Sequence, residues 1–67
     1  MITIELNGEN HTIPRGYSVC DLLKETGTEG KTVAVVVNEL IIRPENRSLH
    51  LLIEGDRVEI LIFAGGG

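Results

Sequence analysis

The chain has 67 residues, of which 42% are hydrophobic and 24% charged, and its formal net charge is −4. This length fits one small domain and is too short to enclose a deep pocket, which argues against a self-sufficient enzyme. The acidic balance disfavours nucleic acid as a partner, because surfaces that bind nucleic acid are basic. No apolar stretch is long enough to span a bilayer, and Cys20 has no second cysteine to pair with. We therefore expect a cytoplasmic protein without disulfides and without membrane association.

The first half of the chain predicts a hairpin followed by a helix. Residues 2–6 alternate apolar and polar side chains, which is the period-two pattern of a half-buried strand. Asn7-Gly8 favours a tight hairpin turn, and residues 11–13 are expected to form the returning strand. Ser18 is a candidate N-cap for a short helix, and Gly27 is placed to end that helix.

The second half of the chain predicts further strands. Residues 33–37 are rich in β-branched side chains without a polar interruption, as expected for a central strand. The segments expected after it, in chain order, are a turn at Asn38-Glu39, a returning strand over 40–43, an irregular or single helical turn over 44–48, an ambiguous segment over 49–53 and a last strand over 57–63.

This order of elements indicates an α+β fold in which one amphipathic helix packs across one face of a mixed sheet. A helix between the second and third strands permits a crossover connection within that sheet. We expect residues 1–63 to form the domain and residues 64–67 to form a flexible C-terminal glycine tail, because glycine adds nothing to a core and is entropically expensive to order.

Alternation along the strands predicts an apolar patch outside the core. In the last strand, one alternating set is expected to face the helix, namely Val58, Ile60 and Ile62. The other set then leaves Leu61 and Phe63 outside, and the same reasoning leaves Ala34 and Val36 outside the central strand. Exposed apolar patches of this kind are typical of docking surfaces, and this one adjoins the tail.

Several segments, taken in order, form a recognisable pattern over essentially the whole chain. They are Ile2-Thr3-Ile4-Glu5-Leu6-Asn7-Gly8, Ser18-Val19-Cys20-Asp21-Leu22-Leu23, Val35-Val36-Val37-Asn38 with Arg43, and Gly55-Asp56-Arg57-Val58-Glu59-Ile60 leading to Gly66-Gly67. With this pattern the chain resembles the sulfur carrier proteins of thiamine biosynthesis, the ThiS family of small ubiquitin-like β-grasp proteins.

The resemblance implies a carrier chemistry at the end of the chain. An E1-like adenylyltransferase would use Mg-ATP to adenylate the carboxylate of Gly67, and a sulfur donor system would convert it to a thiocarboxylate. That sulfur would then pass to a thiazole synthase. Ala64, Gly65 and Gly66 would contact the partners together with Gly67, and the apolar patch of Ala34, Val36, Leu61 and Phe63 would be the docking surface. The chain itself would be a carrier without a bound cofactor, and not an enzyme.

Three alternatives remain open at this point. The chain could carry sulfur for another pathway such as molybdopterin synthesis, although it lacks the proline-rich approach to the glycines seen in that family. It could be a ubiquitin-like modifier joined to lysines, or a β-grasp binding module whose tail is incidental. Many members of the resembled family have Asn-Gly after the central strand, so the turn at Asn38-Glu39 must differ or be strained.

The other chemistry-bearing residues are expected to be structural. Cys20 is expected to be partly buried beside Asp21 and unreactive. His11, His50 and Cys20 lack metal-ligand spacing, so no metal site is expected. Asp56 and Glu59 could be a catalytic carboxylate pair, but turn and surface roles fit a chain without a pocket better.

Overall fold

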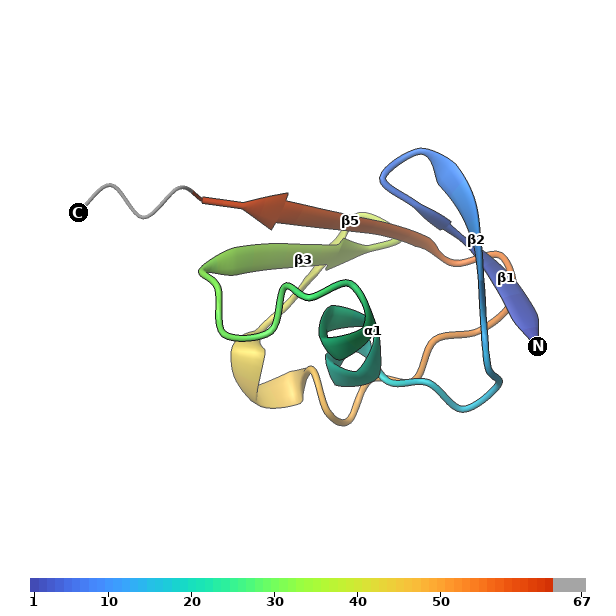
Figure 1. Ribbon diagram of the computed structural model, residues 1–67, viewed down its shortest axis with the longest axis horizontal. Helices are drawn as coiled ribbons and strands as arrows, with labels where there is room; N and C mark the ends of the chain where they lie inside the picture. The colour runs from blue at the N-terminus through green and yellow to red at the C-terminus, as the bar shows by residue number, and fades with distance from the viewer. Residues whose placement is uncertain (64–67) are drawn as a thin grey trace.

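The computed structural model of the protein describes residues 1–63 (Figure 1). Its elements, in chain order, are the strands β1 (Ile2–Leu6) and β2 (Glu9–Ile13), the helix α1 (Val19–Glu25), the strands β3 (Val33–Val37) and β4 (Leu40–Ile42), the short 3-10 helix η1 (Pro44–Asn46) and the strand β5 (Arg57–Ile62). Within the described part of the chain, no helix is both long and apolar enough to cross a membrane.

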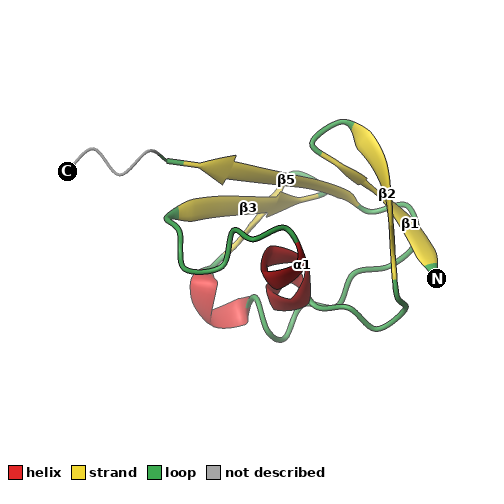
Figure 2. Cartoon of the chain, in the orientation of Figure 1, coloured by secondary structure: helices red, strands yellow, loops and turns green. Residues whose placement is uncertain are grey.

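The five strands form one mixed sheet in the order β2-β1-β5-β3-β4. The central strand β5 runs parallel to β1 and antiparallel to β3, and the two hairpins β1–β2 and β3–β4 lie at the sheet edges. The connection through α1 links the edge strand β2 to β3, and both helical segments lie on the same side of the sheet (Figure 2). The predicted α+β β-grasp fold, with one helix across a mixed sheet, is confirmed.

The core lies between α1 and the covered face of the sheet. Its buried members come from every strand, from α1 and from the segment before β5, namely Ile2, Ile4, Ile13, Val19, Leu22, Leu23, Val35, Val37, Ile42, Leu52, Val58 and Ile60. A helix of seven residues is unstable in isolation, so α1 depends on this packing. The buried Leu52 also gives the ambiguous segment 49–53 a structural role, because it anchors that segment under the sheet.

Local signals set the two ends of α1 as predicted. The Asp21 N–H donates to the Ser18 hydroxyl at 3.1 Å, and the Ser18 N–H donates to the Asp21 carboxylate at 2.9 Å. This reciprocal capping box satisfies donors that the helix cannot. The hydrogen bond from the Ser18 N–H is also the main reason that the pKa of Asp21 is lowered. Gly27, with φ of 73°, follows the C-cap Thr26 and ends the helix.

One predicted core residue is not buried. Ile62 was expected to face the helix, but its side chain is 54% exposed, so that prediction is wrong. Its register partner on β3 is Val33, which is itself only half-buried. Figure 1 shows the reason, since the end of β5 extends past α1 and leaves the last strand residues without cover. The alternation of β5 therefore predicts its covered face only as far as Ile60.

Candidate functional site

The open face of the sheet, opposite α1, carries the predicted apolar patch. The register pairs Ala34 with Leu61 and Val36 with Glu59 across β3 and β5. Directly paired residues of antiparallel strands point to the same face, so these four side chains adjoin one another. Ala34 and Val36 lie outside the core, as expected, but their side chains are half-buried because strands flank β3 on both sides.

Ile41 also belongs to this face, and the reasoning from sequence missed it. It is the register partner of Val36 on β4, and its side chain is 70% exposed. The signal was available in the alternation of the returning strand, because Ile42 enters the core and its neighbour must then point away. We refer to Ala34, Val36, Ile41, Leu61 and Phe63 as the open-face patch.

The end of β5 is apolar on both of its sides. The exposed fractions of Leu61, Ile62 and Phe63 are 49%, 54% and 56%. The N–H of Phe63 donates to the carbonyl of Thr32 at 3.0 Å, so the pairing with the β3 side continues one residue past β5. Consecutive exposed apolar residues at a strand end are favourable for covering by another protein, because their burial removes apolar surface from water.

The remaining predicted site residues are Ala64, Gly65, Gly66 and Gly67, and they lie outside the described residues. They follow Phe63 directly in the sequence. The open-face patch is therefore continuous in sequence with the residue predicted to carry sulfur, and a protein that holds one is well placed to contact the other.

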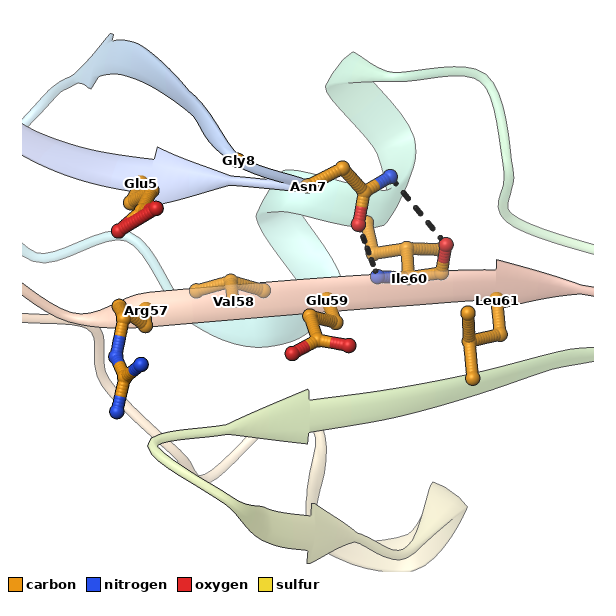
Figure 3. A pocket seen from close by; sticks show the side chains of 8 residues that line it. All are labelled: Glu5, Asn7, Gly8, Arg57, Val58, Glu59, Ile60 and Leu61. Carbon is orange, nitrogen blue, oxygen red and sulfur yellow. Dashed lines mark hydrogen bonds between the residues drawn. The ribbon is translucent and has the colours of Figure 1, made fainter.

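A hollow of about 410 Å³ lies on the other flank of β5, between this strand and the turn that joins β1 to β2 (Figure 3). Charged side chains from β1 and β5 line the hollow, namely Glu5, Arg57 and Glu59. Figure 3 shows the Asn7 amide reaching across to the backbone of Ile60, with two hydrogen bonds between them. The hollow is shallow and open, so it is a groove beside the strand and not an enclosed substrate pocket.

The two carboxylates considered as an acid–base pair have separate surroundings. Asp56 is buried, and its Oδ1 accepts a hydrogen bond from Asn38 Nδ2 at 2.9 Å, while its Oδ2 accepts one from the Ile53 N–H at 2.9 Å. Glu59 is exposed on the open face. The turn role predicted for Asp56 is confirmed, but the residue lies in the interior and not on the surface.

The remaining chemistry-bearing side chains make structural contacts. Cys20 is partly buried on α1, as predicted. His11 Nε2 lies 2.9 Å from Glu25 Oε1, and this contact links β2 to the end of α1. Among residues 1–63, no three His, Cys, Asp or Glu side chains gather in a way that could hold a metal ion.

Known proteins resemble this chain along nearly its whole length. It is 34% identical over 64 residues to a thiazole synthase of Magnetococcus marinus, a match that covers 96% of this chain and 20% of the relative. A thiazole synthase of Paramagnetospirillum magneticum is also 34% identical, over 62 residues, with 92% of this chain and 19% of the relative covered. The chain thus spans about a fifth of the length of the curated relatives it matches.

A solved structure and a family model agree with this similarity. The crystal structure of a thiamine biosynthesis protein (ThiS) from Geobacter metallireducens superposes with a TM-score of 0.83 at 28% identity, covering 98% of this chain and 100% of that one. The model of the ThiS family matches residues 4–67, which include the glycines at the end of the sequence. From the β-grasp sheet, the strand β5 that leads into the glycines and this match, we conclude that the chain belongs to the ThiS family.

Proposed function

We propose that the protein is a sulfur carrier in the thiazole branch of thiamine biosynthesis, acting as a co-substrate of partner enzymes. The observation that carries this proposal is the family match, which runs through Gly66 and Gly67. The fold supports it, because β5 leads into those residues with exposed apolar side chains on both of its sides. The similarity of nearly the whole chain to a fifth of two thiazole synthases supports the choice of pathway.

The proposed chemistry takes place at the carboxylate of Gly67. A carboxylate resists nucleophilic attack until one oxygen becomes part of a good leaving group. An E1-like adenylyltransferase would supply this by joining the carboxylate oxygen to the α-phosphorus of Mg-ATP, with release of pyrophosphate. A hydrosulfide equivalent from the sulfur donor would then attack the acyl carbon and displace AMP. The thiocarboxylate that results forms without oxidation or reduction, and its sulfur is the more potent nucleophile.

The properties of this chain suit a carrier role. Three consecutive glycines carry no side chain that could obstruct entry into a narrow active site. The open-face patch supplies apolar area for docking, and the partners would supply the acid–base groups, the metal ion and the nucleotide. In this division of labour the carrier contributes the reacting carboxylate and a surface for recognition.

Intact mass spectrometry tests the proposal directly. After incubation with a thiamine-pathway adenylyltransferase, ATP and a sulfur donor, the protein should gain the mass difference between one sulfur atom and one oxygen atom. A variant that lacks Gly66 and Gly67 is the control, and it should show no gain. If the full chain also stays unchanged with a partner that modifies its own known carrier, the proposal is wrong.

The same experiment separates a carrier from a protein modifier. A modifier would appear as adducts joined to lysine side chains of other proteins, which survive reducing agents and run as heavier species. A carrier leaves no such adducts, because its thiocarboxylate is consumed by transfer of sulfur. Recovery of isopeptide-linked peptides that end in Gly66-Gly67 would therefore favour the modifier.

A further inference from the structure

The two edges of β5 are used differently along its length. On the side of β3, the Asn38 N–H donates a hydrogen bond to the Arg57 carbonyl at 2.8 Å, and the Phe63 N–H donates one to the Thr32 carbonyl at 3.0 Å. The odd-numbered residues of β5 therefore direct their backbone groups to β3. By the alternation of a strand, the even-numbered residues direct theirs to the opposite edge, where β1 lies.

That opposite edge is paired only over the first part of the strand. The N–H of Asn7 donates to Val58 O at 2.9 Å, and there the chain turns away into β2. The next even-numbered residue, Ile60, is satisfied by a side chain: its N–H donates to Asn7 Oδ1 at 2.9 Å, and Asn7 Nδ2 donates to its carbonyl at 3.4 Å. The side-chain amide of Asn7 thus makes the two hydrogen bonds that the backbone of a further β1 residue would have made to Ile60.

Ile62 is the next even-numbered residue, and its N–H and carbonyl point to an edge that β1 no longer occupies. Its side chain is 54% exposed, and the side chains of Leu61 and Phe63 beside it are also half-exposed. The groove of about 410 Å³ beside Asn7 adjoins the same edge and offers room for the side chains of an added strand. Natural proteins usually protect such an edge with charge, proline or a covering segment, and Leu61-Ile62-Phe63 provides no charge or proline.

We propose that an extended segment of the thiazole synthase adds to the sheet at this edge of β5 and pairs with the N–H and carbonyl of Ile62. This inference rests on the proposed carrier function and names how one partner holds the strand. Two observations favour the synthase as occupant. Residues 64–67 follow β5 directly, so an enzyme that holds Gly67 reaches Ile62 at the same time. Two thiazole synthases contain a segment similar to this chain, which indicates that carrier and synthase are used together.

Strand addition supplies affinity through backbone hydrogen bonds, and it also fixes the direction in which the next residues leave the sheet. A pairing at Ile62 would hold the end of β5 against the synthase that receives Gly67. Leu61 of the open-face patch also lines this groove, so the added strand would cover it, whereas Ala34, Val36 and Ile41 lie on β3 and β4 and remain available.

Amide hydrogen exchange measured by NMR tests the pairing at the level of one atom. In the free protein, the Ile62 N–H should exchange quickly and the Leu61 N–H slowly, since only the latter faces β3. With saturating thiazole synthase, exchange at Ile62 should slow by at least about tenfold, as expected when a strand amide becomes hydrogen-bonded. The unmodified carrier serves for this measurement, so the result does not depend on whether a thiocarboxylate ever forms.

Three other exchange patterns would overturn the proposal. Protection of Ile62 in the free protein, rising with its concentration, would identify a second copy of the chain as the occupant. Protection of Ile62 by the adenylyltransferase and not by the synthase would show that the adenylyltransferase, and not the proposed synthase, occupies the edge. An unprotected Ile62 in a complex that the synthase demonstrably forms would exclude strand addition altogether.

An Ile62→Pro variant removes the donor and provides a second readout. Proline is tolerated at open strand edges, because no internal hydrogen bond is lost there, so the fold should persist. Its dissociation constant for the synthase should rise by about tenfold, the effect of one lost hydrogen bond. The matched control Ile62→Val keeps the N–H and a β-branched side chain, and should bind within about twofold of the original protein. Equal weakening by both variants would place the effect in the side chain and contradict the pairing.

Discussion

Asp56 shows how a residue typical of a turn can become an internal connector. Both of its carboxylate oxygens accept hydrogen bonds, one from the side chain of Asn38 and one from the backbone of Ile53. Asn38 Oδ1 in turn accepts from the Arg57 N–H at 2.9 Å. The β3–β4 turn is thereby tied to the loop that precedes β5, and the start of the strand that leads to the tail is held in place.

Replacement of Asp56 by alanine should lower the free energy of unfolding by about 2 kcal/mol, because it removes the acceptor of two partly buried hydrogen bonds, from Asn38 and Ile53. Denaturation by urea, followed by circular dichroism, would measure the change. Glu59→Ala is the matched control, since Glu59 is an exposed acidic residue on β5, shortly after Asp56 in the chain, and its effect should stay within about 0.5 kcal/mol. Equal effects of the two substitutions would contradict the internal role of Asp56.

Asp21 should make stability depend on pH in the acid range. Hydrogen bonds from the backbone and side chain of Ser18 lower the pKa of this carboxyl in the folded protein. A group whose folded pKa is depressed contributes its stabilisation above its unfolded pKa, about 3.9 for Asp, and loses it as the pH falls through the lower folded value. Unfolding free energies measured at a series of pH values should therefore decline below about pH 4.

In the Asp21→Asn variant this part of the decline should be absent, because the amide does not titrate. The variant should be less stable than the original protein at neutral pH, and the difference should shrink as acid is added. Two curves that stay parallel from neutral to acid pH would show that the capping box contributes no pH-dependent stability.

At the scale of elements, both hairpin turns contain two consecutive residues with positive φ, but the second of these residues differs between the turns. Both begin with asparagine at φ of 49°, followed by Gly8 at 86° in the first turn and by Glu39 at 70° in the second. Each asparagine also bonds through its side chain to a neighbouring segment, Asn7 to Ile60 and Asn38 to Asp56. Glu39 has a Cβ and adopts a left-handed backbone conformation that favours glycine. The turn at Asn38-Glu39 is therefore strained, which was one of the two outcomes expected for it.

Glu39→Gly should therefore raise the free energy of unfolding by about 0.5–1 kcal/mol, since relief of the left-handed conformation outweighs the greater freedom of glycine in the unfolded chain. The reciprocal change, Gly8→Ala, should lower it by about 1 kcal/mol. Thermal and chemical denaturation of the two variants provide the comparison. A loss of stability in Glu39→Gly would mean that the glutamate side chain makes a favourable contribution that its backbone angle conceals.

At the scale of the whole molecule, exposed apolar side chains gather at more than one place. The open-face patch adjoins the end of the sequence, whereas another group lies around β4 and the segment before β5, namely Leu40, Leu49, Leu51 and Ile53. The register pairs Leu40 with Val37, which in turn pairs with Val58 near the start of β5. Leu40 thus lies toward the opposite end of the sheet from Phe63, and Leu49, Leu51 and Ile53 lie outside the strands. This second group provides an internal comparison for the docking role.

Leu61→Asp should slow thiocarboxylate formation with limiting partner enzyme by about tenfold or more, because it places a charge in the centre of the proposed docking surface. Leu51→Asp puts the same charge on an exposed leucine away from the open-face patch, and should change the rate by no more than about twofold. Rates would be followed by intact mass spectrometry, with circular dichroism to verify folding. A similar rate for the two variants would remove the open-face patch from the docking surface.

The sequence alone determined the elements and the family. Alternation in residues 2–6, the capping signals around Ser18 and the apolar run 33–37 act over a few residues, where local sterics and hydrogen bonding dominate, so they were predictable. Only the tertiary structure decided which strand residues α1 covers, and Ile62 is exposed because α1 does not reach it. The tertiary structure also decided which distant donors reach the carboxylate of Asp56. The open edge beyond Asn7 was likewise invisible, because it arises where two strands far apart in sequence stop pairing. Such features depend on the lengths and positions of packed elements, which no local pattern encodes.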